Sequence, residues 1–416
     1  MHRSPSPRRA RRVAAPAVVV SLALLAAACT GAAPGTAPAR GAERITVWTD
    51  EDRLPTFEAL AAEHTAATGV EVTVEGRAND ELRQAFLAGV GSGRGPDVLV
   101  GAHDWLGELV AAGAVVPVAI GDPEAFVPAA VQAVAYGGET YGVPLSTENV
   151  ALVRNDGLTR LDPATFEEAV AEGERLVAAG RADRPLLLQQ TEAASDPYHL
   201  YPLQTSFGVP VFATDATGSY TSELALAGEG GHAFASYLGD LGDRGVLDPA
   251  VDADVARETF EAGRAPFVVT GPWNVPAFLE AGIDVTVLPV PPAGPQPAQP
   301  FVGVQAAFVS ATTLREPLAL AFVASLAAPE VQARIAEATG RAPAVAAAVA
   351  TFADDPVLQG FSAAGAEGAP MPAIPQMSVV WSFWGSVEHQ LVTGSGDPAA
   401  LWDGMVAAIE GAVAGA

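Results

Sequence analysis

Residues 45–75 read I-T-V-W-T-D-E-D-R-L-P-T-F-E-A-L-A-A-E-H-T-A-A-T-G-V-E-V-T-V-E, and this stretch decides the fold class. The β-branched run Ile45–Thr49 predicts a strand, and Val70–Glu75 predicts a second one. Between them, apolar side chains recur at helical spacing from Pro55 to Gly69. Strand, helix and strand within about 30 residues form a βαβ unit. The chain is therefore expected to be an α/β protein.

The same alternation of strands and helices continues along the 416 residues, which predicts two domains with a core each. A strand containing Pro144 is expected to end at Glu148, and the next strand begins directly at Asn149. A short connection between two α/β units is typical of a hinge. Strands predicted at 301–305 and 307–310 lead back toward the first unit.

Further elements are assigned from local patterns. Val115–Val118 is expected to be a strand, and the Ala-rich segment Ala342–Ala350 a helix. The segment Asp162–Glu168 is expected to be a capped helix start, with the helix continuing to Gly180. Asn274 is expected to cap a short helix with its side chain. The final helix is expected at 397–414.

The first 28 residues have the pattern of an export signal, with five arginines before the apolar run Val13–Leu25. Small residues then precede Cys29, the only cysteine in the chain. This arrangement resembles a bacterial lipoprotein signal, in which the cysteine thiol receives a diacylglyceryl group after cleavage. Alternatively, Cys29 merely lies near a conventional cleavage site. The Ala-, Pro- and Gly-rich residues up to 42 form a flexible tether.

The charge of the chain excludes some classes of partner. Without residues 1–28, 17 arginines face 48 acidic residues, a formal net charge of −31. Such a surface repels nucleic acid and anionic membranes. The six histidines and one cysteine show no metal-ligand spacing, so neither a metal nor a cofactor is expected.

Acidic and aromatic residues, alone or in small groups, recur where predicted strands end. They are Asp52 with Arg53, Asp104 with Trp105, Glu148, Asp196 with Tyr198, Trp273 and Trp381. Carboxyl ends of strands are where ligands bind in open α/β sheets. A sugar ring has an apolar face that packs on Trp or Tyr and a rim of hydroxyls that bind carboxylate and guanidinium groups. The pattern therefore favours a carbohydrate site.

The segment Pro370–Trp384 reads P-M-P-A-I-P-Q-M-S-V-V-W-S-F-W. Its three prolines predict a stiff extended lead-in, because each lacks an N–H and has a fixed φ. Two tryptophans and a phenylalanine follow. Their rings either pack in a core or line a binding cleft, and we expect at least one to line the cleft.

Four motifs together resemble the maltose/maltodextrin-binding proteins of ABC importers, over about residues 44–412. They are G-P-D-V-L-V-G-A-H-D-W from Gly95, T-G-P-W from Thr270, P-F-V-G-V from Pro300 and M-P-A-I-P-Q-M-S-V-V-W from Met371. The resemblance implies the two-lobed periplasmic-binding-protein fold, α/β in each lobe. The N-lobe is expected at 43–147 and 306–351, and the C-lobe at 148–305 and 352–416.

The resemblance also implies the ligand-binding residues. They are Asp52, Arg53, Asp104, Trp105, Glu148, Asp196, Tyr198, Trp273, Met371 and Trp381. Gly101, Trp105 and Gly385 depart from the family pattern, as do Arg83 and Gln84 at the chain-end subsite. The central stacking wall is thus expected to be kept and the edge subsites rebuilt.

The implied function is to bind an α-glucoside between two closing lobes and to deliver it to a membrane permease. Maltose, longer or cyclic maltodextrins and trehalose remain open as ligands. The protein is expected as a monomer, anchored by Cys29 at the outer face of the membrane or in the periplasm. Two alternatives are a glycoside hydrolase, which needs two carboxylates across one bond, and a sugar sensor without a transport role.

Overall fold

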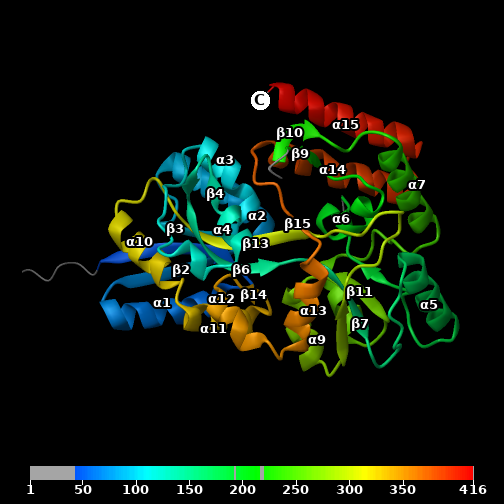
Figure 1. Cartoon of the computed structure of the whole chain (residues 1–416), viewed down its shortest axis with the longest axis horizontal. Coiled ribbons are helices and arrows are strands. Elements are labelled where there is room, and N and C mark those ends of the chain that lie inside the picture. The colour runs from blue at the N-terminus through cyan, green and yellow to red at the C-terminus, as the bar shows by residue number, and fades with distance from the viewer. Residues whose placement is uncertain (1–42, 192–193, 216–219, 416) are drawn as a thin grey trace, which may run out of the picture. The chain divides into compact units, whose positions relative to one another are not determined.

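Two larger β-sheets with flanking helices organise the part of the chain that the computed structural model describes, residues 43–191, 194–215 and 220–415 (Figure 1). The predicted signal peptide (1–28) and the tether (29–42) with Cys29 lie outside these residues.

The first sheet has seven strands in the order β14-β6-β13-β3-β1-β2, with β15 paired to β13. Its strands are β1 (Arg44–Asp50), β2 (Glu71–Arg77), β3 (Val98–Ala102), β6 (Gly142–Glu148), β13 (Phe301–Val309), β14 (Ala342–Pro343) and β15 (Ala369–Pro370). Strand β1 runs parallel to β2 and β3, and β13 runs antiparallel to β3 and β6. The predicted βαβ unit is confirmed.

The second sheet has the order β12-β7-β11-β8. Its strands are β7 (Ala151–Asn155), β8 (Leu187–Leu188), β11 (Phe267–Thr270) and β12 (Val285–Leu288). Two hairpins add β4 (Ala135–Tyr136) with β5 (Glu139–Thr140), and β9 (Phe212–Thr214) with β10 (Tyr220–Leu224).

Helices cover both sheets. They are α1 (Leu54–Thr68), α2 (Asn79–Ser92), α3 (Leu106–Ala111), α4 (Pro128–Ala133), α5 (Phe166–Ala178), α6 (Pro197–Ser206), α7 (Glu229–Asp243), α8 (Ala253–Glu261), α9 (Val275–Glu280), α10 (Glu316–Ser325), α11 (Pro329–Thr339), α12 (Ala346–Val349), α13 (Pro356–Gly365), α14 (Gln376–Val392) and α15 (Pro398–Gly415). Short 3-10 turns lie at His103–Trp105, Pro123–Ala125, Pro272–Asn274 and Ala350–Phe352. Helices α7, α14 and α15 pack against one another (Figure 1).

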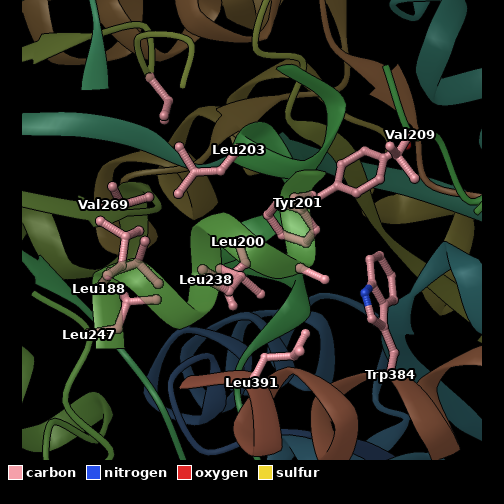
Figure 2. Packing of buried hydrophobic residues seen from close by; sticks show 14 of the residues in the cluster. Leu188, Leu200, Tyr201, Leu203, Val209, Leu238, Leu247, Val269, Trp384 and Leu391 are labelled. Atoms are coloured by element: carbon pink, nitrogen blue, oxygen red, sulfur yellow. The ribbon is translucent and has the colours of Figure 1, made fainter. Parts of the chain in front are cut away.

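Each sheet has its own hydrophobic core. Ile45, Val100 and Phe322 are fully buried around the first sheet. Around the second, Leu200, Tyr201 and Leu238 pack together, and Trp384 and Leu391 reach this cluster from α14 (Figure 2). The predicted α/β class with helix-flanked sheets is therefore confirmed.

The chain passes from the first sheet to the second directly after β6, at Asn149–Val150, and it returns with β13. It passes over again between α12, which contacts β14, and α13, which contacts β12. Glu148 is therefore the last residue of β6, directly before the chain passes from the first sheet to the second.

Some predicted elements are wrong. Val115–Val118 forms only an isolated bridge from Val115 to Ser310. Ala342–Pro343 is β14, paired with β6, so the helix predicted over 342–350 is reduced to α12. Pro343 cannot donate the hydrogen bond that a helix interior requires, and the pairing with β6 overrides the propensity of the alanines.

Two further assignments change in detail. The strands predicted on either side of residue 306 are one continuous strand, β13. Asn274 precedes α9, but its side chain donates to Thr270 Oγ1 at 2.9 Å instead of capping the helix. The capped start expected within Asp162–Glu168 is confirmed, and the structure identifies the cap as Thr165, whose hydroxyl accepts from the Glu168 N–H.

Within the described ranges, no single helix is long and apolar enough to cross a membrane; α10 and α11 meet that criterion only as a pair, with a 73° bend between them.

Candidate functional site

A cleft of about 830 Å³ contains side chains from both sheets. This volume is in the range of sites that bind small molecules. All ten predicted ligand-binding residues line it: Asp52, Arg53, Asp104, Trp105, Glu148, Asp196, Tyr198, Trp273, Met371 and Trp381. The structure thus brings these ten together, while their role in binding stays a prediction.

Aromatic rings form part of the cleft wall. Trp273 follows β11 in the Pro272–Asn274 turn, and Tyr198 lies in the first turn of α6. Their ring centroids are 6.3 Å apart, with planes inclined by 40°. Trp381 lies in the second turn of α14. These rings offer flat apolar surface to a ligand.

Two of the tryptophans lie over a glycine at the end of the preceding strand. A Cβ atom at Gly101 would overlap the Trp105 ring, and one at Gly271 would overlap the Trp273 ring. Each glycine therefore lets an indole lie directly on the backbone. Position 101 has no side chain of its own because the Trp105 ring occupies that space.

Glu148 is the centre of a buried charged group. Its carboxylate accepts from Gln305 Nε2 at 2.6 Å and from the Arg341 guanidinium, and Arg53 lies 4.0 Å away. Burial alone would raise the pKa of Glu148, but the charges of Arg341 and Arg53 hold it below its ordinary value. Glu148 is thus kept ionised inside the cleft.

Arg53 itself is buried, whereas Asp52 stands exposed at the rim of the cleft. The Arg53 guanidinium forms an ion pair with Asp50, the last residue of β1. Burial, together with the nearby charge of Arg341, lowers the pKa of Arg53 to about 9. Asp50 was not predicted as part of the site.

Burial raises the pKa of Asp104 to about 6, although the Arg83 charge and a hydrogen bond from the Trp381 side chain favour the charged form. The carboxyl is therefore largely ionised at neutral pH. Within the described part of the chain, Asp104 Oδ1 has no hydrogen-bond partner. It can accept a hydrogen bond from a ligand hydroxyl.

Asp196 caps α6 and accepts from the His199 backbone N–H. Gln189 Nε2 donates to its Oδ2 at 2.6 Å, and the His199 ring Nδ1 lies 2.9 Å from the same oxygen. Burial opposes ionisation, but His199 and these hydrogen bonds hold the pKa of Asp196 below its ordinary value.

Met371 is held in place by a buried histidine. The Val304 N–H donates to His103 Nδ1 at 3.0 Å, so the ring proton is on Nε2, which donates to the Met371 carbonyl at 3.0 Å. Burial lowers the pKa of His103 to about 4, which keeps the ring neutral. His103 thus joins β3, β13 and the Pro370–Pro375 segment.

Several buried polar atoms in the cleft lack a protein partner among the described residues. They include the Tyr198 hydroxyl, Asp104 Oδ1 and Gln305 Oε1. A buried polar group without a hydrogen bond is costly. A ligand with several hydroxyl groups would provide the missing partners.

The sequence did not identify the other polar residues that line the cleft, namely Asp50, Asn79, Gln189, His199, Asp254, Arg257, Asn274, Gln305 and Arg341. Gln305 follows the P-F-V-G-V motif directly, which is a signal that could have identified it. Arg341 carries no such signal, because it lies directly before the Ala-rich stretch Ala342–Ala350, which the sequence predicts to be a helix.

Three of the positions expected at the rebuilt edge subsites, Arg83, Gln84 and Gly385, do not line the cleft. Arg83 lies 3.4 Å from Glu108. At Gly385 a Cβ atom would be 2.8 Å from the Ser195 carbonyl oxygen, so no larger residue fits there. Among the described residues, no group of three or more His, Cys, Asp or Glu side chains is placed to hold a metal ion.

The chain is similar to several characterised proteins. A 28% identical "Maltotriose-binding protein" of Pyrococcus abyssi matches 82% of this chain and 76% of its own length. A "Galactooligosaccharide-binding protein" of Bacillus subtilis is 27% identical, with 91% of each chain covered. A "Maltooligosaccharide ABC transporter solute-binding lipoprotein" of Streptococcus pneumoniae is 26% identical, with 91% and 92% covered.

Among solved structures, the Thermus thermophilus maltotriose-binding protein bound with maltotriose is 31% identical and has a TM-score of 0.81. The match covers 89% of this chain and 100% of that one. A family model described as "Bacterial extracellular solute-binding protein" matches residues 59–360. By fold, cleft and sequence, the chain belongs to the family of bacterial extracellular solute-binding proteins.

Proposed function

We propose that this protein binds maltooligosaccharides between two lobes and delivers them to the permease of an ABC importer. The observation that carries the proposal is a single cleft in which aromatic rings lie beside buried, unpartnered polar atoms. The rings suit the apolar faces of glucose units, and the polar atoms suit their hydroxyls. Relatives that bind maltotriose and maltooligosaccharides support the choice of sugar.

The lobes are proposed at 43–147 with 306–351 and at 148–305 with 352–416, with the hinge beside Glu148. A ligand that touches both lobes only in the closed form would stabilise that form. In this proposal the ten predicted residues bind the sugar and no bond is broken. The extracellular family description supports a site of action outside the cytoplasm.

The test is a calorimetric titration of residues 43–416 with maltose, maltotriose, trehalose, a cyclodextrin and a galactooligosaccharide. We expect dissociation constants of about 1 μM or below for maltotriose, and no release of glucose during prolonged incubation. If the protein binds trehalose, the cyclodextrin or the galactooligosaccharide but no maltooligosaccharide, that sugar is the ligand and the proposed substrate is wrong. Glucose release would instead support a hydrolase, and no binding at all would contradict the proposal.

The lipid anchor is a separate part of the proposal. Small residues before Cys29 and the lipoprotein among the relatives support acylation at this thiol. In a bacterial host fed a labelled fatty acid, the full chain should carry the label and stay with the membrane fraction. The Cys29→Ser variant should be unlabelled. Equal labelling of both proteins would show that Cys29 is not the acceptor.

A further inference from the structure

The turn Gly340–Arg341 places an arginine against both sides of the cleft. Helix α11 ends at Thr339 and is capped by Gly340, whose φ of 68° suits glycine. Strand β14 then pairs with β6 beside Glu148. A Cβ atom at Gly340 would be 2.6 Å from the Pro272 carbonyl oxygen. The turn after α11, next to the first sheet, therefore packs directly on the turn that carries Trp273, next to the second.

The Arg341 side chain contacts residues next to both sheets. Its Nε donates to Glu148 Oε2, and its guanidinium carbon lies 5.4 Å from the centroid of the Trp273 ring. Only 6% of the residue is exposed. A planar guanidinium can pair with a carboxylate along its edge while its face lies on an indole ring. Lysine, a point charge on a flexible stem, cannot do both with one fixed geometry.

We propose that Arg341 is a positioning residue of the sugar site, which holds the Glu148 carboxylate and the Trp273 ring in the arrangement that binds the ligand. The inference rests on the proposed sugar-binding function of the cleft. Arg341 joins an acid at the end of β6 to an aromatic ring after β11. It thereby couples the hydroxyl-binding and ring-stacking parts of the site, which come from different sheets.

The groups that interact with the Glu148 carboxylate include Arg53, Arg341, Gln305, His103 and Tyr198. Burial favours the neutral acid, and the two arginines oppose it. Without Arg341, the pKa of Glu148 should rise, so that between pH 7 and 5 the carboxyl binds a proton more readily than in the unaltered protein. In the unaltered protein Glu148 should stay ionised over this range.

The experiment compares Arg341→Gln and Arg341→Lys, with Arg334→Gln as the matched control. Arg334 lies in the middle of α11, the helix that precedes Arg341, but it is exposed and pairs with Glu63. Titrating the full mature protein with maltotriose at pH 7, we expect Arg341→Gln to bind about 10- to 100-fold more weakly. Arg341→Lys should recover part of this loss, and Arg334→Gln should bind normally.

The pH profile separates positioning from general damage. Asp104 has a pKa of about 6, so its protonation should weaken binding below pH 6 in the unaltered protein and in all three variants alike. The effect of Arg341 is the loss of affinity beyond this shared decrease. Arg341→Gln should lose further affinity between pH 7 and 5, and Arg341→Lys should not. Unchanged affinity, or a loss that is the same at every pH and is not recovered by lysine, would overturn the proposal.

A second readout needs no sugar. The carboxyl carbon resonance of Glu148, assigned with a Glu148→Gln variant, reports its titration in the ligand-free protein. Its pKa should be higher in Arg341→Gln than in the unaltered protein, and an unchanged pKa would contradict the positioning role. If the unaltered protein binds no sugar, the proposed function fails, while this titration still tests whether Arg341 holds Glu148.

Discussion

Replacing Trp384 with alanine is expected to lower the free energy of unfolding by about 3–5 kcal/mol, as for other large aromatic residues removed from a core. Trp384 is fully buried in the hydrophobic cluster (Figure 2). Its indole N–H donates to Gln204 Oε1 at 3.1 Å. Its ring meets Tyr201 edge-on at 6.0 Å. The substitution leaves a cavity and removes the donor from a buried amide oxygen, and both effects are destabilising.

The measurement is urea unfolding followed by far-UV circular dichroism. Trp381→Ala is the matched control, because Trp381 lies one turn earlier on the same helix and stacks on Trp384 at 5.3 Å, but it lines the cleft. Trp381→Ala should lose less stability and more affinity. Equal losses of stability in the two variants would show that burial of Trp384 contributes no more to the free energy of unfolding than Trp381 does.

Replacing Trp273 with alanine is expected to have the largest effect on binding. Loss of a central aromatic residue in a binding site costs about 2–4 kcal/mol, which corresponds to about a 30- to 1,000-fold weaker complex. Trp273 lines the cleft with Tyr198 beside it and Arg341 over its ring. Calorimetric titration with the sugar that binds best measures the loss, and the melting temperature shows whether the fold is kept.

Two further variants refine this result. Gly271→Ala keeps the ring but forces it away from the backbone, because the new Cβ atom overlaps it. We expect an affinity between those of the unaltered protein and Trp273→Ala. Leu279→Ala, on the following helix, removes a half-exposed side chain outside the cleft and should bind normally. Normal binding by a folded Trp273→Ala would mean that the ring is not a binding surface.

Local patterns predicted much of the fold because they depend on neighbouring residues. The βαβ unit after Ile45 follows from side-chain spacing, and the capped helix start within Asp162–Glu168 follows from polar side chains beside free backbone N–H groups. The wrong assignments lie where distant pairing decides. Ala342–Pro343 becomes a strand because β6 is beside it, although β6 is nearly 200 positions earlier in the chain.

The sequence by itself determined the fold class and most of the ten predicted side chains that gather at the cleft, because polar and aromatic residues at strand ends lie where those ends converge. Only the tertiary structure added Arg341 and paired it with Glu148. The two residues are 193 positions apart and meet because β14 pairs with β6. It also separated Trp384, in the core, from Trp381, in the cleft, because burial depends on what packs against each face of α14.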